Sequence, residues 1–134
     1  MEFAKAELAD LREHRALDYA TYQADRVLRR NLERMIENIC NAVCDTGKIM
    51  LAQYDVPMPD TYRDIFVKLA AVGATNAGLS QRLGDAMRVR SILAHQYLDL
   101  KWEYIKGFLA PGMESVECFL RQTEDWLRAN SQGS

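Results

Sequence analysis

The residues best suited to chemistry lie close together, between positions 88 and 97. Arg90, His95 and Tyr97 fall within eight residues. A histidine exchanges a proton near neutral pH, an arginine offers a fixed fork of donors to a phosphate, and a tyrosine hydroxyl can donate to or accept from the same group. Cleavage of a phosphodiester without a metal needs these groups. The competing interpretation is structural: a histidine at a helix end, a half-buried tyrosine and a solvated arginine.

Other familiar chemistries find little support in the sequence. It has no glycine-rich phosphate loop and no His-Glu-x-x-His motif. Cys40 and Cys44 stand four residues apart, but a structural zinc site needs four ligands, and His14 and His95 have no partner at metal-binding spacing. We interpret these two cysteines and Cys118 as small core residues and His14 as a surface residue. No metal and no cofactor are predicted.

Length and composition indicate a single folded domain. The 134 residues are 49% hydrophobic and 27% charged, with only 7 Gly and 3 Pro, which disfavours turn-rich β folds. The net charge of -2 excludes a bulk attraction to nucleic acid, so such binding needs a local patch. No apolar stretch suits a membrane span or a signal peptide, and the three cysteines are odd in number. We expect a reduced cytoplasmic protein without a membrane partner, with one domain over residues 1–130 and a polar tail over 131–134.

Hydrophobic periodicity predicts three helices on the N-terminal side of the segment over residues 88–97. Apolar residues recur in steps of three and four and predict a helix from about Thr21 to Gln53, preceded by a shorter one from Glu2 to about Arg15. The prolines within Tyr54–Asp60 predict a break. Asp60 is then expected to cap a helix from Thr61 to about Val72.

The remaining helices carry or follow the candidate residues. After a loop over Gly73–Gly78, a helix is predicted from Leu79 to about Tyr97, and Asp99 is expected to cap the next one. Pro111-Gly112 should kink or break that last helix before its pattern resumes. No strand pattern appears. The sequence therefore predicts an all-α, up-and-down bundle of about five helices.

An ideal helix would not bring the three candidate side chains to one point. At about 100° per residue, Arg90 and Tyr97 lie roughly 20° apart, whereas His95 lies roughly 140° from Arg90. Three solutions remain open: the helix distorts near His95, the long arginine spans the gap, or a second subunit in a two-fold dimer completes the site.

At this segment the sequence resembles a known family. Arg90-x4-His95-x-Tyr97 resembles the Arg-x4-His-x-Tyr signature of the HepT toxins, minimal members of the HEPN ribonuclease superfamily. The family usually has Asn after the motif arginine, where this chain has Ser91, a polar residue that can keep a supporting role. The resemblance covers most of the chain and includes segments 41–47, 56–66, 83–87 and 97–100.

The resemblance implies a fold, an activity and an assembly. It implies a HEPN-like bundle in a symmetric homodimer, in which the motifs of both chains face a shared cleft. The implied activity is metal-independent endoribonuclease cleavage. His95 would move protons at the ribose 2′-OH or the leaving 5′ oxygen, and Arg90 would hold the scissile phosphate and stabilise its charge. The product would be a 2′,3′-cyclic phosphate, and DNA would not be a substrate.

The resemblance also implies a partner. HepT toxins are typically encoded beside MntA-type nucleotidyltransferase antitoxins, which transfer AMP from ATP onto the motif tyrosine. Tyr97 would be that adenylylation site, and its hydroxyl should be exposed. The modification would place a phosphate beside Arg90 and block the cleft. The chain would therefore be the toxin of a toxin–antitoxin system.

Positive residues around the motif are candidates for RNA binding. Arg82, Arg88 and Lys101, together with Arg90, are predicted to line the mouth of the cleft. Two alternatives stay open: a non-catalytic helical subunit that binds a nucleotidyltransferase and presents its substrate, and a bundle that only dimerises.

Overall fold

All regular structure in the described part of the chain is helical. The computed structural model describes residues 1–132, so Gly133 and Ser134 of the predicted tail lie outside the described residues. The elements are α1 (Glu2–Arg12), α2 (Tyr19–Ala24), α3 (Arg26–Leu51), α4 (Tyr62–Ala71), α5 (Ala77–Ala86), α6 (Val89–Ile92), α7 (Leu98–Gly107), the π-helical segment η1 (Phe108–Gly112) and α8 (Met113–Gln132). The predicted all-α class is confirmed.

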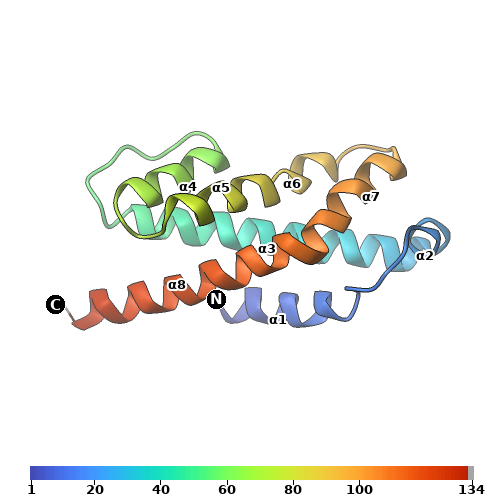
Figure 1. Ribbon diagram of the computed structural model, residues 1–134, viewed down its shortest axis with the longest axis horizontal. Helices are drawn as coiled ribbons and strands as arrows, with labels where there is room; N and C mark the ends of the chain where they lie inside the picture. The colour runs from blue at the N-terminus through green and yellow to red at the C-terminus, as the bar shows by residue number, and fades with distance from the viewer. Residues whose placement is uncertain (133–134) are drawn as a thin grey trace.

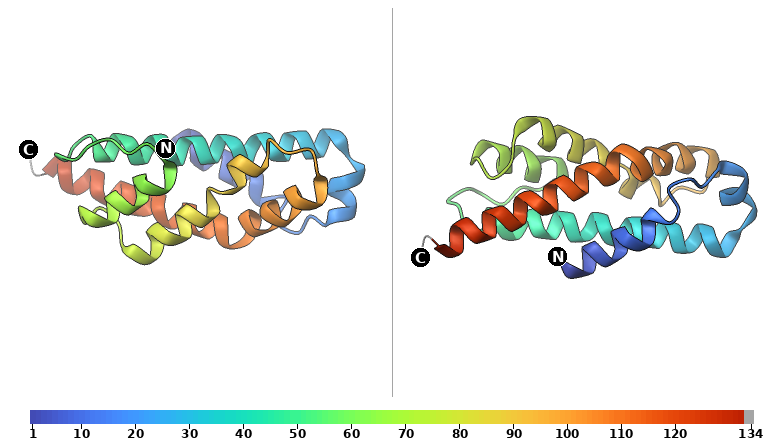
Figure 2. Two further views of the ribbon diagram at one scale, coloured as in Figure 1. Left: turned by 90° about the horizontal axis from the view of Figure 1, so that it is seen from above. Right: turned by 60° about the horizontal axis from the view of Figure 1, so that its bottom comes forward.

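The long helix α3 is the axis of the bundle (Figures 1 and 2). Its 26 residues span about 39 Å. α1 packs along one side of it, α4 packs against its C-terminal half, and α5 packs on α4 and α8. α6 and α7 lie farther toward its N-terminal half, and α7, η1 and α8 form a continuous rod that runs back along the bundle. Among the described residues, no helix is both long and apolar enough to cross a membrane.

The core forms where α3 meets α4 and α8. The ring of Phe66 on α4 meets that of Phe119 on α8 edge-on, with 5.8 Å between the ring centres. Gly47 allows α4 to approach α3 closely, because a Cβ atom there would lie 2.7 Å from Cγ2 of Ile65. The predicted burial of Cys40 and Cys44 is confirmed, and Cys118 is half-buried.

Of the helices predicted before the proline-containing break, one is divided and the other is shorter. The predicted helix over 21–53 is α2 followed by α3, because Asp25 leaves helical geometry (φ -105°, ψ 98°) and its carboxylate accepts the backbone N–H of Leu28 at 3.0 Å. The hydrophobic pattern of the neighbouring residues is the same whether Asp25 lies within a helix or caps one, so the pattern alone does not predict this break. α1 ends at Arg12, not at about Arg15.

Both predicted aspartate caps are wrong. Thr61, not Asp60, caps α4, since its hydroxyl accepts the N–H of Asp64 at 3.2 Å. α7 has Tyr97 as its N-cap without a side-chain cap. Asp99 lies in the first turn of α7, where a carboxylate favours the helix dipole, and accepts a hydrogen bond from the Tyr19 hydroxyl.

The last predicted helix does not break at its proline. Pro111 lacks a backbone N–H, and the chain widens locally into the π-helical η1 before continuing as α8. The hydroxyl of Ser115 donates to the carbonyl oxygen of Pro111 at 3.1 Å and uses one of the freed acceptors. α8 runs through Gln132, two residues into the segment predicted as a tail.

Candidate functional site

His95 and Tyr97 lie on a turn between α6 and α7, whereas Arg90 lies on α6 itself. α5 ends at Ala86, α6 is a single turn that ends at Ile92, and helix resumes only at Leu98. The prediction of a continuous helix to about Tyr97 is therefore wrong. The N–H of His95 donates to the carbonyl of Ile92 at 3.0 Å, and Tyr97 is extended (φ -79°, ψ 112°). The chain does depart from helix before His95, which is the first of the three solutions to the angular problem, and completion of the site by a second subunit stays a prediction.

Packing explains why the turn is presented to solvent. Leu93 and Leu98 are half-buried against the core and hold the two ends of the turn. His95 and Gln96 between them are exposed, and Tyr97 is 76% exposed. The predicted exposure of Tyr97 is confirmed, so a second protein can reach its side chain.

Arg90 lies against α3 and keeps its positive charge uncompensated. Burial raises the pKa of the Cys44 thiol, while the nearby charge and a hydrogen bond of Arg90 oppose that rise. Burial likewise raises the pKa of Cys40, and Arg90 again acts in the opposite direction. Within residues 1–132 no carboxylate forms an ion pair with Arg90. The residue is exposed, and an arginine without a carboxylate partner can bind an anion.

Ser91 on α6 and Asn41 on α3 differ in whether their polar side-chain atoms have hydrogen-bond partners. The hydroxyl of Ser91 donates to the carbonyl of Arg88 at 3.1 Å, so this hydrogen bond stabilises the helical turn that contains Ser91. Asn41 follows Cys40 on α3, and its Oδ1 is buried without a hydrogen-bond partner among the described residues. A buried acceptor left unpaired costs about 1–3 kcal/mol. The sequence motif gave no reason to single out Asn41 as an open acceptor.

The other predicted RNA-binding residues occupy different environments. Lys101 donates to Glu33 of α3 at 3.1 Å, and with side-chain exposures of 13% and 18% this ion pair lies in the seam between α7 and α3. The guanidinium of Arg88 lies 5.6 Å from the ring centre of Tyr104. Arg88 and Arg90 are two residues apart, which places them roughly 160° from each other around a helical turn.

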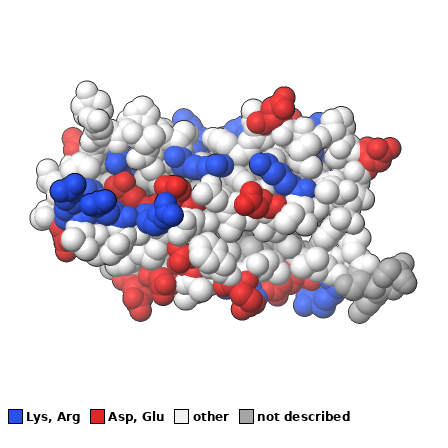
Figure 3. All heavy atoms as spheres, turned by 180° about the vertical axis from the view of Figure 1, so that it is seen from behind, with Lys and Arg blue, Asp and Glu red and all other residues white. Residues whose placement is uncertain are grey.

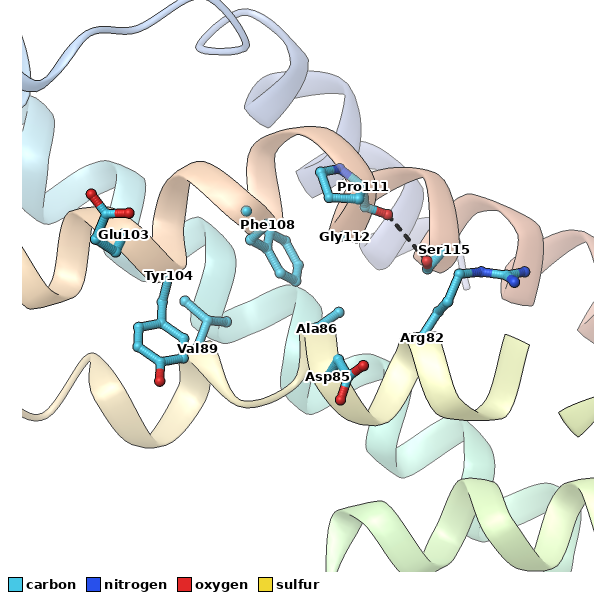
Figure 4. A pocket seen from close by; sticks show the side chains of 11 residues that line it. Arg82, Asp85, Ala86, Val89, Glu103, Tyr104, Phe108, Pro111, Gly112 and Ser115 are labelled. Atoms are coloured by element: carbon cyan, nitrogen blue, oxygen red, sulfur yellow. Dashed lines mark hydrogen bonds between the residues drawn. The ribbon is translucent and has the colours of Figure 1, made fainter. Parts of the chain in front are cut away.

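A pocket lies on the Arg88 side of α6. It encloses about 330 Å³ between α5, α6, α7, η1 and α8 (Figure 4). Arg82, Asp85 and Glu103 supply charged groups at its lining, and Tyr104 and Phe108 supply aromatic ones. Arg82 therefore belongs to a hollow whose lining does not include Arg90, His95 or Tyr97.

The comparisons with known proteins first define the class of fold. The chain matches the solved structure of a tri-AMPylated Shewanella oneidensis HEPN toxin in complex with MNT antitoxin, with a TM-score of 0.73 and 19% sequence identity. The match covers 93% of this chain and 98% of that one. The fold is thus that of a HEPN toxin, as the sequence predicted.

The family follows from the sequence itself. A family model described as Ribonuclease HepT-like matches residues 4–123, a range that contains the whole motif segment. The protein belongs to the HepT-like ribonuclease family. A search of curated proteins found no significant match.

Proposed function

We propose that the protein is the toxin of a toxin–antitoxin pair and acts as a metal-independent endoribonuclease. One observation carries the proposal: a chain of the HepT-like ribonuclease family presents His95 and Tyr97 on an exposed turn between α6 and α7, directly after Arg90 on α6, which is also exposed. The cytoplasm, where RNA and ATP are both available, is the proposed place of action.

The chemistry follows from the properties of two side chains. The ribose 2′ oxygen attacks the adjacent phosphorus, the bond from phosphorus to the 5′ oxygen breaks, and a 2′,3′-cyclic phosphate and a 5′-hydroxyl remain. His95 takes the proton from the 2′-OH or gives one to the leaving 5′ oxygen. Arg90, which has no carboxylate partner within residues 1–132, holds the phosphate and stabilises the charge that develops on it.

A symmetric homodimer is part of the proposal. The motif turn is exposed at one edge of the protomer, and a two-fold axis beside it would set two copies across one cleft. The cleft would then hold two arginines and two histidines, enough for one group to accept a proton while another donates one.

Adenylylation of Tyr97 by an MntA-like nucleotidyltransferase antitoxin is the proposed means of neutralisation. The Tyr97 oxygen attacks the α-phosphorus of ATP, loses its proton to the transferase, and pyrophosphate leaves. The 76% exposure of Tyr97 supports this step, since a transferase must reach the hydroxyl. The HEPN toxin of similar fold was solved in a tri-AMPylated state with MNT antitoxin. An AMP group on Tyr97 would place its phosphate where Arg90 is proposed to hold the phosphate of the RNA substrate.

A second candidate function rests on Ser91. Its hydroxyl bonds the carbonyl of Arg88 instead of supporting the motif side chains. A protein with a weakened catalytic contact would suit the alternative, a non-catalytic helical subunit that presents substrate to a nucleotidyltransferase.

Incubation of purified protein with total RNA in EDTA separates the two functions. Wild type and His14→Ala, a control at the other histidine, should cleave RNA, and His95→Ala should not. If none of the three proteins cleaves RNA while wild type binds a nucleotidyltransferase, the second function holds.

A further inference from the structure

Three exposed arginines follow one another along the N-terminal half of α3. Arg26, Arg30 and Arg34, here called the basic stripe, are each exposed. Among the described residues Arg26 and Arg30 have no ion-pair partner, and Arg34 has only Glu37 at 3.9 Å in a pair with side-chain exposures of 73% and 46%. Such an exposed pair contributes little. Figure 3 shows positive side chains gathered over this half of α3.

A fourth arginine on this half of α3, Arg29, has a structural role that the three stripe residues lack. Arg29 donates to the carbonyls of Tyr22 and Gln23 at 3.1 and 2.9 Å, which closes the end of α2. The guanidinium of Arg29 also lies 5.9 Å from the ring centre of Tyr22. Within residues 1–132 the stripe residues donate no hydrogen bond to a helix end, so helix termination does not account for them.

Helix geometry places the basic stripe beside the motif. On α3, Cys44 faces Arg90 of α6 and Glu33 binds Lys101 of α7. Arg26 lies about five turns before Cys44 and so at nearly the same angle around α3, and each later stripe residue is rotated by roughly 40°. The stripe therefore follows the edge of the seam in which α6 packs on α3 and the Glu33–Lys101 ion pair joins α7 to α3.

We infer that the basic stripe binds the sugar-phosphate backbone of single-stranded RNA and leads the strand to Arg90. Successive stripe residues rise by about 6 Å along the helix, a spacing suited to successive phosphates of an extended strand. Guanidinium groups bind phosphates with two parallel hydrogen bonds. Because the whole chain carries a net charge of -2, attraction to RNA must come from a local patch of this kind. The inference rests on the proposed function and names its substrate contact.

Binding to an RNA that cannot be cleaved tests the stripe apart from the chemistry. The probe is a fluorescent single-stranded oligonucleotide with 2′-O-methyl groups, which lacks the attacking hydroxyl, and the readout is anisotropy over a range of KCl concentrations. Arg26→Gln/Arg30→Gln is compared with wild type and with Arg121→Gln/Arg128→Gln. The control pair removes the same charge from exposed positions on α8.

Counterion release sets the expected size of the effect. Two lost phosphate contacts should reduce the slope of log K against log salt by about 1.4 and weaken binding about 25-fold at about 0.1 M salt, since each contact on a single strand contributes about 0.7 to the slope. The control pair should stay within about twofold of wild type. Arg26→Lys/Arg30→Lys, which keeps the charges, should keep the wild-type slope.

The outcomes separate the inference from the proposed function. Equal affinity and salt slope for the stripe variant and the control pair would overturn the inference, even if wild type cleaves RNA. If wild type cleaves no RNA but binds the probe through the stripe, the inference stands and the proposed function fails. Unfolding temperatures close to that of wild type would show that lost binding does not come from lost folding.

Discussion

The ion pair between Glu33 and Lys101 should stabilise the fold as a coupled unit. Glu33 accepts the Tyr22 hydroxyl at 2.7 Å with one oxygen and the Lys101 ammonium at 3.1 Å with the other. Burial, together with the hydrogen bond to Glu33, raises the pKa of Tyr22, so the phenol stays protonated and keeps donating. One carboxylate therefore joins α2 and α7 to α3. The N–H of Lys101 also bonds the carbonyl of Tyr97 at 3.1 Å, which closes the end of the motif turn.

The expected magnitude follows from the low exposure of both side chains. Hydrogen bonds to charged groups contribute about 1.5–3 kcal/mol, and at 13% and 18% exposure solvent screens this pair only in part. Glu33→Gln and Lys101→Met should each lower the free energy of unfolding by about 1.5–3 kcal/mol. The double variant should lose about 1–2 kcal/mol less than the sum of the singles, because it no longer leaves one charge unpaired.

Urea unfolding followed by circular dichroism measures these differences. Lys106→Met is the control, since its pair with Glu103 has side-chain exposures of 60% and 67%, and its effect should stay within about 0.5 kcal/mol. Single losses that add to the double loss within about 0.5 kcal/mol would refute the coupling.

Three further predictions concern the modification site, the cysteines and the core. Tyr97→Phe should accept no AMP from an MntA-like transferase, as mass spectrometry of the protein would show; labelling of this variant would contradict the assignment. Burial raises the pKa of Cys40 and Cys44, so both thiols should stay protonated and resist iodoacetamide at about pH 8 until urea unfolds the chain. Rapid alkylation of Cys40 or Cys44 in the native protein, located by peptide mass spectrometry, would be inconsistent with the packing, whereas the half-buried Cys118 is free to react. Gly47→Ala puts a methyl group 2.7 Å from a Cγ2 atom of stiff Ile65. It should destabilise by about 1–2 kcal/mol, the cost of overpacking less the helix gain over glycine; a stabilised variant would show that α4 moves away freely.

Regular spacing of hydrophobic residues and the helix-breaking prolines make much of the fold predictable from the sequence. The apolar stripe of α3 and the proline-containing break after it have physical causes within a few residues, and both were found. The division at Asp25 was not predictable, since one extended residue leaves the hydrophobic pattern unchanged. The choice of Thr61 over Asp60 as cap depends on which backbone becomes extended, and tertiary packing decides that.

The candidate site was predictable in residue type and less so in geometry. The motif named Arg90, His95 and Tyr97, but the turn that carries the last two depends on Leu93 and Leu98 packing on the core. Nothing local in Leu93–Tyr97 disfavours a helix, which is why a continuous one was predicted. The place of Lys101 in the seam likewise depends on a carboxylate 68 positions away in the sequence.

The central claim is that His95 and Arg90 cut RNA through the ribose 2′-OH. The most direct measurement is cleavage of a defined RNA oligonucleotide in EDTA, with mapping of the cut and mass analysis of the ends, beside the same oligonucleotide carrying one 2′-deoxy residue at the mapped site. The account predicts a 2′,3′-cyclic phosphate and a 5′-hydroxyl from wild type, and no cut at the deoxy position or by His95→Ala. Cleavage at the deoxy position, or equal cleavage by His95→Ala, would contradict it.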